Sequence, residues 1–444
     1  MATCEVHKID SNIVGVRIAE EECLKQLPQP AANVVWNPLE PNSYQDFGVQ
    51  VVTTARNPIN PSRQRQKGIV TDREASVGFG LDFVLAEQQR LLPGFMFAKP
   101  TAEPAAPVAL STTEVTLANG MMKLTATAIP TMVGKLRPGD WVFLGGDGSR
   151  KFTKAGNNGF KRIRSIDGTL AAPTGFTFDK GIKSAEAETF AGPVDMFIPS
   201  TLRNETGQGI VRTSYQFERT LGSLDGLDPP QAEYVTGAVP STYALNLPTA
   251  NKMTTDMTFM ACDGELRTQA DGLKPGTRPA LPDSGAFNTS TDLKRVVMSR
   301  VHTGTTAPTP LFGFLLESTL KINNNLSGNK ALGVVGNFDI TAGTFEVSIS
   351  ATAYFSDVDA IRAVQENADI TLDYLLMKGN TAVVFDMPML SLGDGRPNVE
   401  LDKPITLPLT GDAASGKKLG AAFDYTLGIC FFTQLPALAG ELYD

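Results

Sequence analysis

The chain has 444 residues, of which 42% are hydrophobic and only 19% are charged, with 41 glycines and 29 prolines. This length exceeds one ordinary core, and the composition favours β-strands joined by turns over helical bundles. The net charge of -8 and the isoelectric point near 5.1 argue against a protein that binds nucleic acid over its whole surface, because such proteins are expected to be basic.

The first 110 residues combine strand-like segments with one large basic loop. Three consecutive glutamates at 20–22 predict the start of a short helix, and a proline-rich stretch follows them. Apolar and polar residues alternate over 47–55 and again over 75–85, which is typical of β-strands. The loop between these strands carries the basic residues Arg56, Arg63, Arg65 and Lys67. We interpret the loop either as solvated or as a contact with the acidic C-terminal half of another copy.

A separate unit is predicted between residues 111 and 200. A stretch rich in proline and alanine precedes it, and short strands at close spacing with glycine-rich turns fill it, which indicates a small β-barrel or β-sandwich. Longer strands follow, among them 344–355, where apolar and polar residues alternate strictly. Residues 356–367 predict a short helix with Ser356 as its N-cap.

These patterns predict an all-β chain with one or two short helices and three segments. Residues 1–110 would form an N-terminal arm and the first part of a main β-sandwich, residues 111–200 an inserted outer β-domain, and residues 201–444 the rest of the sandwich. No internal repeat is visible in the sequence. Acidic residues are concentrated after residue 200, where 27 Asp and Glu outnumber 18 Lys and Arg.

No residue pattern for catalysis or for a cofactor is found. His7 and His302 do not stand at the spacings that metal sites or catalytic bases require. The glycines at 145–148 lack the order of a phosphate loop, and a hairpin turn explains them better. The four cysteines are scattered without a C-x-x-C pair, which indicates reduced thiols rather than zinc or disulfides. We therefore expect no enzyme activity, no cofactor and no metal.

Residues 317–360 carry a distinctive order of motifs. A strand ends in isoleucine and three asparagines, a loop with Leu-Gly follows, and a long alternating strand leads to Phe-Ser-Asp and the predicted helix. This order resembles the tail tube proteins of siphophages, and residues 53–68 and 213–221 are similar to an exposed arm and to a sheet strand of that family. The resemblance is carried by Ile322, Asn323, Asn324, Asn325, Leu332, Gly333, Gly343, Phe355 and Asp357.

The resemblance implies a structural virion protein. Its β-sandwich would join those of its neighbours into a continuous barrel, six copies to a ring, and the rings would stack through arms and loops into a tail tube. The tape measure protein and other tail proteins are the implied partners, and genome DNA would pass through the lumen without specific binding. The chain would be made in the host cytoplasm and carried in the virion, and no run of roughly 20 apolar residues predicts a membrane span.

The excess of acidic residues is consistent with a DNA conduit. A basic wall would bind the DNA that the tube has to release. We expect the wall to carry acidic residues from the polar faces of predicted strands. The candidates are Glu218, Glu317, Glu346, Asp369 and Asp373. The alternative is that these side chains face bulk solvent or a neighbouring subunit.

Two other functions remain open at this point. A distal tail or hub protein could be built on a similar sandwich, and it would be present in few copies per virion. A carbohydrate-binding tail adhesin is suggested by the small unit at 111–200, which would then expose an aromatic platform. Trp141 lies in that unit, but its apolar neighbours predict that it fills a core.

Overall fold

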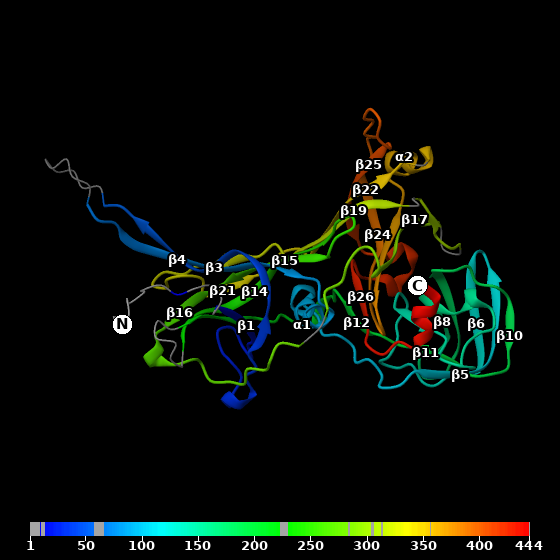
Figure 1. Ribbon diagram of the computed structural model, residues 1–444, viewed down its shortest axis with the longest axis horizontal. Coiled ribbons are helices and arrows are strands. Elements are labelled where there is room, and N and C mark those ends of the chain that lie inside the picture. The colour runs from blue at the N-terminus through cyan, green and yellow to red at the C-terminus, as the bar shows by residue number, and fades with distance from the viewer. Residues whose placement is uncertain are drawn as a thin grey trace, which may run out of the picture.

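The chain is dominated by antiparallel β-structure. The computed structural model describes residues 9, 14–56, 66–222, 230–282, 285–302, 306–311, 314–355 and 357–443. Three α-helices accompany the strands in these residues, so the predicted all-β class is confirmed. Figure 1 shows an elongated molecule, with a long β-hairpin at one end and a compact group of short strands at the other.

Eight antiparallel strands form one broad sheet, which we call the wide sheet. Some of its neighbouring strands, such as β4 and β15, are far apart in the sequence, so its formation depends on long-range pairing. Of the two long strands β14 and β24, only the C-terminal halves belong to it. In spatial order the strands are β3 (Pro41–Thr54), β4 (Ile69–Asp82), β15 (Thr254–Ala261), β14 (Gln231–Leu247), β19 (Leu315–Asn323), β22 (Glu346–Tyr354), β25 (Thr406–Ala414) and β24 (Thr381–Asp394).

The N-terminal halves of β14 and β24 leave the wide sheet and each form the middle of a second sheet, which we call an outer sheet. Long strands of this kind tie the two layers of a sandwich together covalently. The first outer sheet contains β2 (Asn37–Leu39), β1 (Gly15–Glu20), β13 (Tyr215–Gly222), β14 and β16 (Asp263–Arg267). The second contains β18 (Thr309–Pro310), β17 (Leu293–Arg300), β23 (Ile370–Lys378), β24, β26 (Gly428–Phe432) and β12 (Ser200–Arg203).

Strict alternation in the wide sheet places one face in the core. In β15, for example, Met257 and Phe259 are buried, and the polar residues between them are half-exposed. Tyr243 of β14 and Ile322 of β19 join the same core, which helix α1 (Leu85–Met96) also enters. Because side chains alternate with a period of two, a slip of one residue would move this whole apolar set to the solvent side. The hydrophobic pattern therefore fixes the register.

A closed barrel of six strands lies beside the sandwich, and it confirms the predicted small β-barrel. Its core is separate and includes Leu110, Leu124, Val142, Phe176 and Met196. Closure leaves the barrel without free edges, apart from the short β10 (Glu188–Phe190) that adds to β5. The barrel strands follow the order β5 (Val108–Ala118), β11 (Val194–Phe197), β7 (Trp141–Leu144), β8 (Gly159–Gly168), β9 (Pro173–Gly181), β6 (Met121–Ala128) and back to β5.

The barrel packs on the second outer sheet, on the side away from the sandwich core. Trp141 and Phe160 of the barrel share an apolar cluster with Leu375 of β23 and Phe432 of β26. Helix α3 (Ala437–Tyr443) covers the same cluster, and the Tyr443 hydroxyl accepts a hydrogen bond from the Phe160 amide at 3.0 Å. β23 is thus buried on both faces, one against the core and one against the barrel.

Buried ion pairs complete this junction. Arg162 of β8 is fully buried and donates two hydrogen bonds to Asp179, at 2.9 and 2.7 Å, and a third to Asp386 of β24 at 3.1 Å. Lys180 of β9 lies 2.5 Å from Asp373 of β23. Burying a charged group away from water is costly unless the group is paired, and two of these pairs, Arg162–Asp386 and Lys180–Asp373, link the barrel to the sandwich. The junction therefore holds the barrel in one position.

Two local predictions from the sequence are wrong. The glutamates at 20–22 do not open a helix, because Glu20 ends β1 and the Glu21 amide bonds to the Ser214 carbonyl. Helix α2 (Val358–Gln365) forms as predicted, but its N-cap is Asp357, whose carboxylate accepts a hydrogen bond from the Asp359 amide at 3.0 Å. The predicted cap, Ser356, lies outside the described residues.

Arg162→Ala should destabilise the protein strongly. The substitution leaves the carboxylates of Asp179 and Asp386 buried without their cation, and loss of one partner of a buried ion pair costs about 3–5 kcal/mol. Chemical denaturation measures the change. Arg362→Ala is the control, because Arg362 forms an exposed pair with Asp359 on α2 and its loss should cost less than about 0.5 kcal/mol. Equal losses in the two variants would contradict the proposed role of the junction.

Asp373→Asn should alter the acid stability of the protein. Burial raises the pKa of Asp373, but Lys180 and Arg295 outweigh burial and lower it from 3.8 to about 2. A lowered carboxylate pKa adds stability above pH 4, and this stability, about 2 kcal/mol, is lost as the pH falls from 4 to 2. The variant should therefore unfold more easily at pH 6, and its deficit should shrink between pH 4 and 2. Urea titrations at several pH values test this, and a constant deficit would refute it.

Candidate functional site

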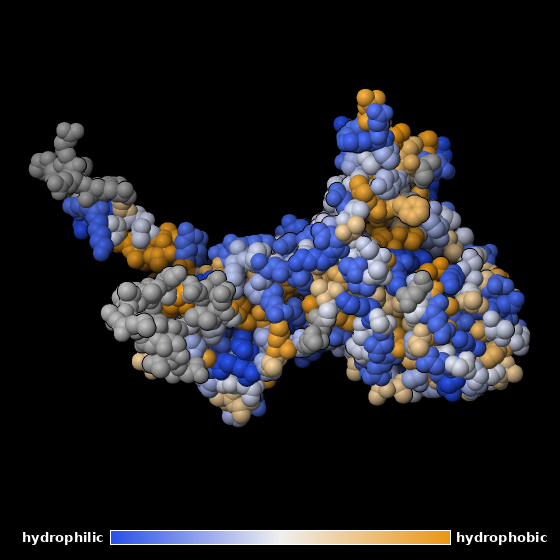
Figure 2. All heavy atoms as spheres, in the orientation of Figure 1, coloured by the Kyte–Doolittle hydropathy of each residue, from blue (hydrophilic) through white to orange (hydrophobic). Residues whose placement is uncertain are grey.

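The solvent side of the wide sheet forms one continuous polar surface, which we call the polar face. Register partners can be followed across its strands: Asp412 lies opposite Ser348, Ser348 opposite Lys321, Lys321 opposite Ala244, and Ala244 opposite Asp256. All of these side chains point away from the core, because core and solvent positions alternate along each strand. Figure 2 shows a mostly hydrophilic border between the β3–β4 hairpin and the top of β22, over β15 and β19.

Acidic residues outnumber basic ones on the central part of the polar face. Lys321 is exposed there, while Asp256 is half-buried and the other acids are exposed. Asp256 accepts hydrogen bonds from Gln45 at 3.1 Å and from Asn246 at 2.8 Å, and Glu317 accepts one from Thr352 at 3.3 Å. The face is therefore wet and negatively charged. Its acids are Asp46, Asp256, Glu317, Glu346 and Asp412, and two further acids of β4 on this side, Glu74 and Asp82, pair with Lys330 and Lys252.

Two of the five acids selected from the sequence, Glu317 and Glu346, lie on the polar face. Both are exposed, on the adjacent strands β19 and β22. Asp369 precedes β23 and is half-buried beside Lys418, at 2.9 and 3.0 Å. It does not belong to the wide sheet. Asp46, Asp256 and Asp412 were not selected, although the alternation of β15 could have identified Asp256.

The remaining two acids, Glu218 and Asp373, are fully buried and hence do not reach the polar face. Glu218 of β13 accepts hydrogen bonds from the Tyr234 hydroxyl at 2.6 Å and from Arg278 at 3.0 and 2.6 Å. Asp373 lies between Lys180 and Arg295. The period of two correctly places both on the side away from the core, but further chain covers that side of each outer sheet. Their charges therefore stabilise the fold.

The wide sheet ends in two edges with unpaired backbone groups in the described residues. β3 pairs with β4 alone, and Ser391–Asp394 of β24 pair with β25 alone. Beside the first edge, Phe47 and Val49 are only partly buried against the core. A long strand that is open on one side is a template for pairing with another strand.

The β3–β4 hairpin extends beyond the sandwich and exposes apolar side chains (Figure 1). The predicted contact residues Arg56 and Lys67 are exposed near its end, and Arg63 and Arg65 lie outside the described residues. An exposed apolar stretch with basic residues beyond it is typical of a surface that contacts another protein. The exposed apolar residues are Val51, Val52, Ile69 and Val70.

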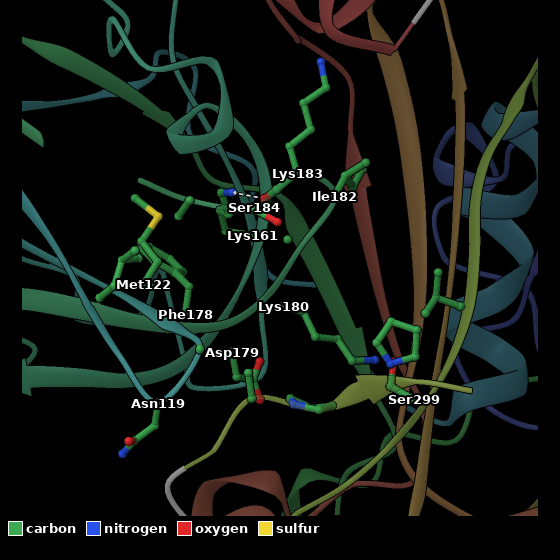
Figure 3. A pocket seen from close by; sticks show the side chains of 18 of the residues that line it. Asn119, Met122, Lys161, Phe178, Asp179, Lys180, Ile182, Lys183, Ser184 and Ser299 are labelled. Carbon is green, nitrogen blue, oxygen red and sulfur yellow. Dashed lines mark hydrogen bonds between the residues drawn. The ribbon is translucent and has the colours of Figure 1, made fainter. Parts of the chain in front are cut away.

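A cavity lies between the barrel and β17, and Figure 3 shows Lys180 directed across it towards the strand that carries Ser299. Three of its basic groups, those of Lys161, Lys180 and Arg295, already have protein partners. Lys161 donates hydrogen bonds to the carbonyls of Gly156, at 2.6 Å, and Lys183, at 3.3 Å, while Lys180 contacts Asp373. Burial lowers the pKa of Lys161 to about 8. We assign this cavity to the structural junction.

The described part of the chain offers neither a metal cluster nor a membrane-spanning helix. No group of three or more His, Cys, Asp or Glu side chains that could hold a metal ion is found in it. None of the helices there is long and apolar enough to cross a membrane.

Comparison with known proteins agrees with this geometry. No curated protein matches the chain significantly. The model of a family described as "Phage tail tube protein" matches residues 11–413, which is nearly the whole chain and includes the first outer sheet and the barrel. The chain therefore belongs to the phage tail tube protein family.

Proposed function

We propose that copies of this protein close into rings through the two edges of the wide sheet and that the rings stack into the tail tube. The single observation that carries this proposal is one continuous sheet with a core on one side, an acidic polar face on the other and an unpaired strand at each end. In a ring, each open edge meets that of the next copy, and no edge remains. The polar face then lines the lumen.

The charge of the polar face supports its role as a lumen for DNA. Five acids and Lys321 give this region a net charge of 1 - 5 = -4 per chain. Duplex DNA carries about one negative charge per 1.7 Å, and a basic wall would hold it by releasing counterions. Screening at physiological salt extends over about 8 Å, so a wall close to the DNA still repels it. The tube thus guides DNA without retaining it.

The barrel belongs on the outside of the tube. It packs on the second outer sheet, whose other face borders the core, so the sandwich separates the barrel from the polar face. We propose the domain division 1–110, 111–200 and 201–444, with the middle segment as an outer domain inserted in the tube domain. The tape measure protein in the lumen and other tail proteins at the tube ends are the proposed partners.

The rival functions find less support. Trp141 is 1% exposed and fills the apolar cluster between barrel and sandwich, so it provides no aromatic platform for a carbohydrate. A distal tail or hub protein is distinguished by copy number, because a tube subunit is among the most abundant proteins of a virion.

Purified protein should assemble into rings or tubes at high concentration. The reason is that the unpaired edges of β3 and β24 gain backbone hydrogen bonds only from other copies. Negative-stain electron microscopy and analytical ultracentrifugation measure assembly. A preparation that stays monomeric at high concentration would contradict the proposed function.

Reversing the charge of the polar face should make the tube retain DNA. Glu317→Lys, Glu346→Lys and Asp412→Lys together change the charge by +6 per chain, and the basic wall should bind short duplex DNA with an affinity that falls steeply with salt. Cosedimentation with nuclease digestion measures the DNA held inside the tubes. Wild-type tubes should retain none.

The control for this experiment carries the same change of charge on the outside. Glu114, Glu186 and Glu441 are exposed on the barrel and on α3, and their replacement by lysine should produce DNA binding that nuclease removes. Protected DNA in this control, or none in the polar-face variant, would show that the polar face does not line the lumen.

A further inference from the structure

The strands of the sandwich fall into two sets with the same chain order and the same pairing. The pairs β1–β2, β1–β13, β13–β14, β14–β15, β14–β16, β4–β15 and β3–β4 recur as β17–β18, β17–β23, β23–β24, β24–β25, β24–β26, β22–β25 and β19–β22. Helix α1 follows β4 as α2 follows β22, and each contacts the long strand of its own set. We call these sets the first and the second repeat.

Irregularities of pairing recur at equivalent places too. A bulge separates Pro41 from Ser43 where β3 pairs with β4, and one separates Leu315 from Glu317 where β19 pairs with β22. Bulges are local features that an unrelated pair of sheets would not share by position. A second pair of bulges lies where the long strands leave the wide sheet, between Tyr215 and Phe217 and between Ile370 and Leu372.

Within the wide sheet, the two repeats meet through a single strand pair. β14 of the first repeat pairs with β19 of the second, from Thr242 opposite Asn323 to Leu247 opposite Ser318. The strands equivalent to β14 and β19 are β24 and β3, which provide the two open edges of the wide sheet. The internal junction is thus a template for the contact between copies.

We infer that the chain is an internal duplication and that β24 of one copy pairs with β3 of the next in the register of the β14–β19 junction; this inference rests on the proposed function. Equivalent bulges and pairings align Thr242 with Gly393 and Asn323 with Gln50. Gly393 therefore lies opposite Gln50, and Leu392 opposite Val51. This pairing covers Val51, which is 50% exposed in the single chain.

The hairpin arms also make the internal junction a guide to the contact between copies. In the second repeat, the loop between β19 and β22 lies on the first repeat, where Lys330 contacts Asp72 and Glu74 and the Asn337 side chain donates to the Ala261 carbonyl at 3.2 Å. The equivalent arm of the first repeat is the β3–β4 hairpin. It meets the loop of the second repeat only on its β4 side, through Asp72 and Glu74, and its β3 edge has no further strand paired with it in the described residues. It is therefore placed to lie on the second repeat of the next copy.

The width of the wide sheet sets the number of chains in a ring. Strands about 4.8 Å apart and tilted by about 40° give barrels of roughly 32, 48 and 96 Å for two, three and six chains of eight strands. Side chains on the inner face narrow each barrel by about 10 Å. The lumen of about 22 Å that remains for two chains leaves no room for a hydrated DNA duplex, whereas the lumen of about 86 Å for six chains leaves a wide gap around it. Three chains, 3 × 2 = 6 repeats, therefore make the ring, in place of the six chains expected from the sequence.

Cysteine cross-linking tests the register. Gly393→Cys with Gln50→Cys, in a background with Cys4→Ser and Cys23→Ser, should give disulfides between chains upon oxidation of assembled tubes, and a ladder on non-reducing gels that ends at three chains. Thr242→Cys with Asn323→Cys, the equivalent pair at the internal junction, should close within one chain and give no ladder. Native mass spectrometry of rings should show three chains.

The matched control shifts one partner along the same face. Gly393→Cys with Asp46→Cys moves the second cysteine by four residues, about 14 Å along β3, which is beyond the reach of a disulfide. Rings of six chains, or equal cross-linking in the shifted pair, would overturn the inference while the tube function stands. Failure of the wild-type protein to assemble would overturn both.

Discussion

The backbone at the ends of the wide sheet is the constraint on which the rest of the structure depends. Each unpaired amide and carbonyl needs a partner, and a strand as long as β3 exposes a whole row of them. Within the chain, β14 and β19 satisfy this need for each other. The other two edges have no such partner in the described residues. In a single chain their backbone groups stay unpaired, and another copy of the chain can supply the partner strands.

The alternation of side chains makes this incomplete sheet suitable for a channel. One register buries residues such as Phe259 and Ile322 and, in the same strands, presents Asp256 and Lys321 to water. Burial of each large apolar side chain contributes about 1.5–3 kcal/mol to the stability of the fold, so the apolar residues determine which face of the sheet is exposed to solvent. The charge of the polar face can then vary without loss of the fold, because exposed substitutions usually change stability by less than about 0.5 kcal/mol.

The strand class, the barrel and helix α2 could be predicted because each has a local signature of alternation, spacing or capping. Which strand faces are exposed to solvent could not be predicted, because exposure depends on segments that are distant in the sequence. Glu218 and Asp373 lie away from the core as the alternation predicts, yet a loop with Arg278 and the barrel with Lys180 cover them. The two repeats escaped detection for a similar reason. Pairing and bulges are preserved between them, whereas the residues at equivalent positions, such as Phe79 and Ala351, differ in size.

The barrel is inserted after α1, in the first repeat, but it docks on the outer sheet of the second. Its buried ion pairs therefore join an insertion of the first repeat to strands of the second repeat. Only one half carries such a projection. In the proposed tube, the outer wall would therefore have half the rotational symmetry of the bore. A protein that binds the exterior would meet one barrel per chain, while cargo inside would meet two equivalent repeats per chain.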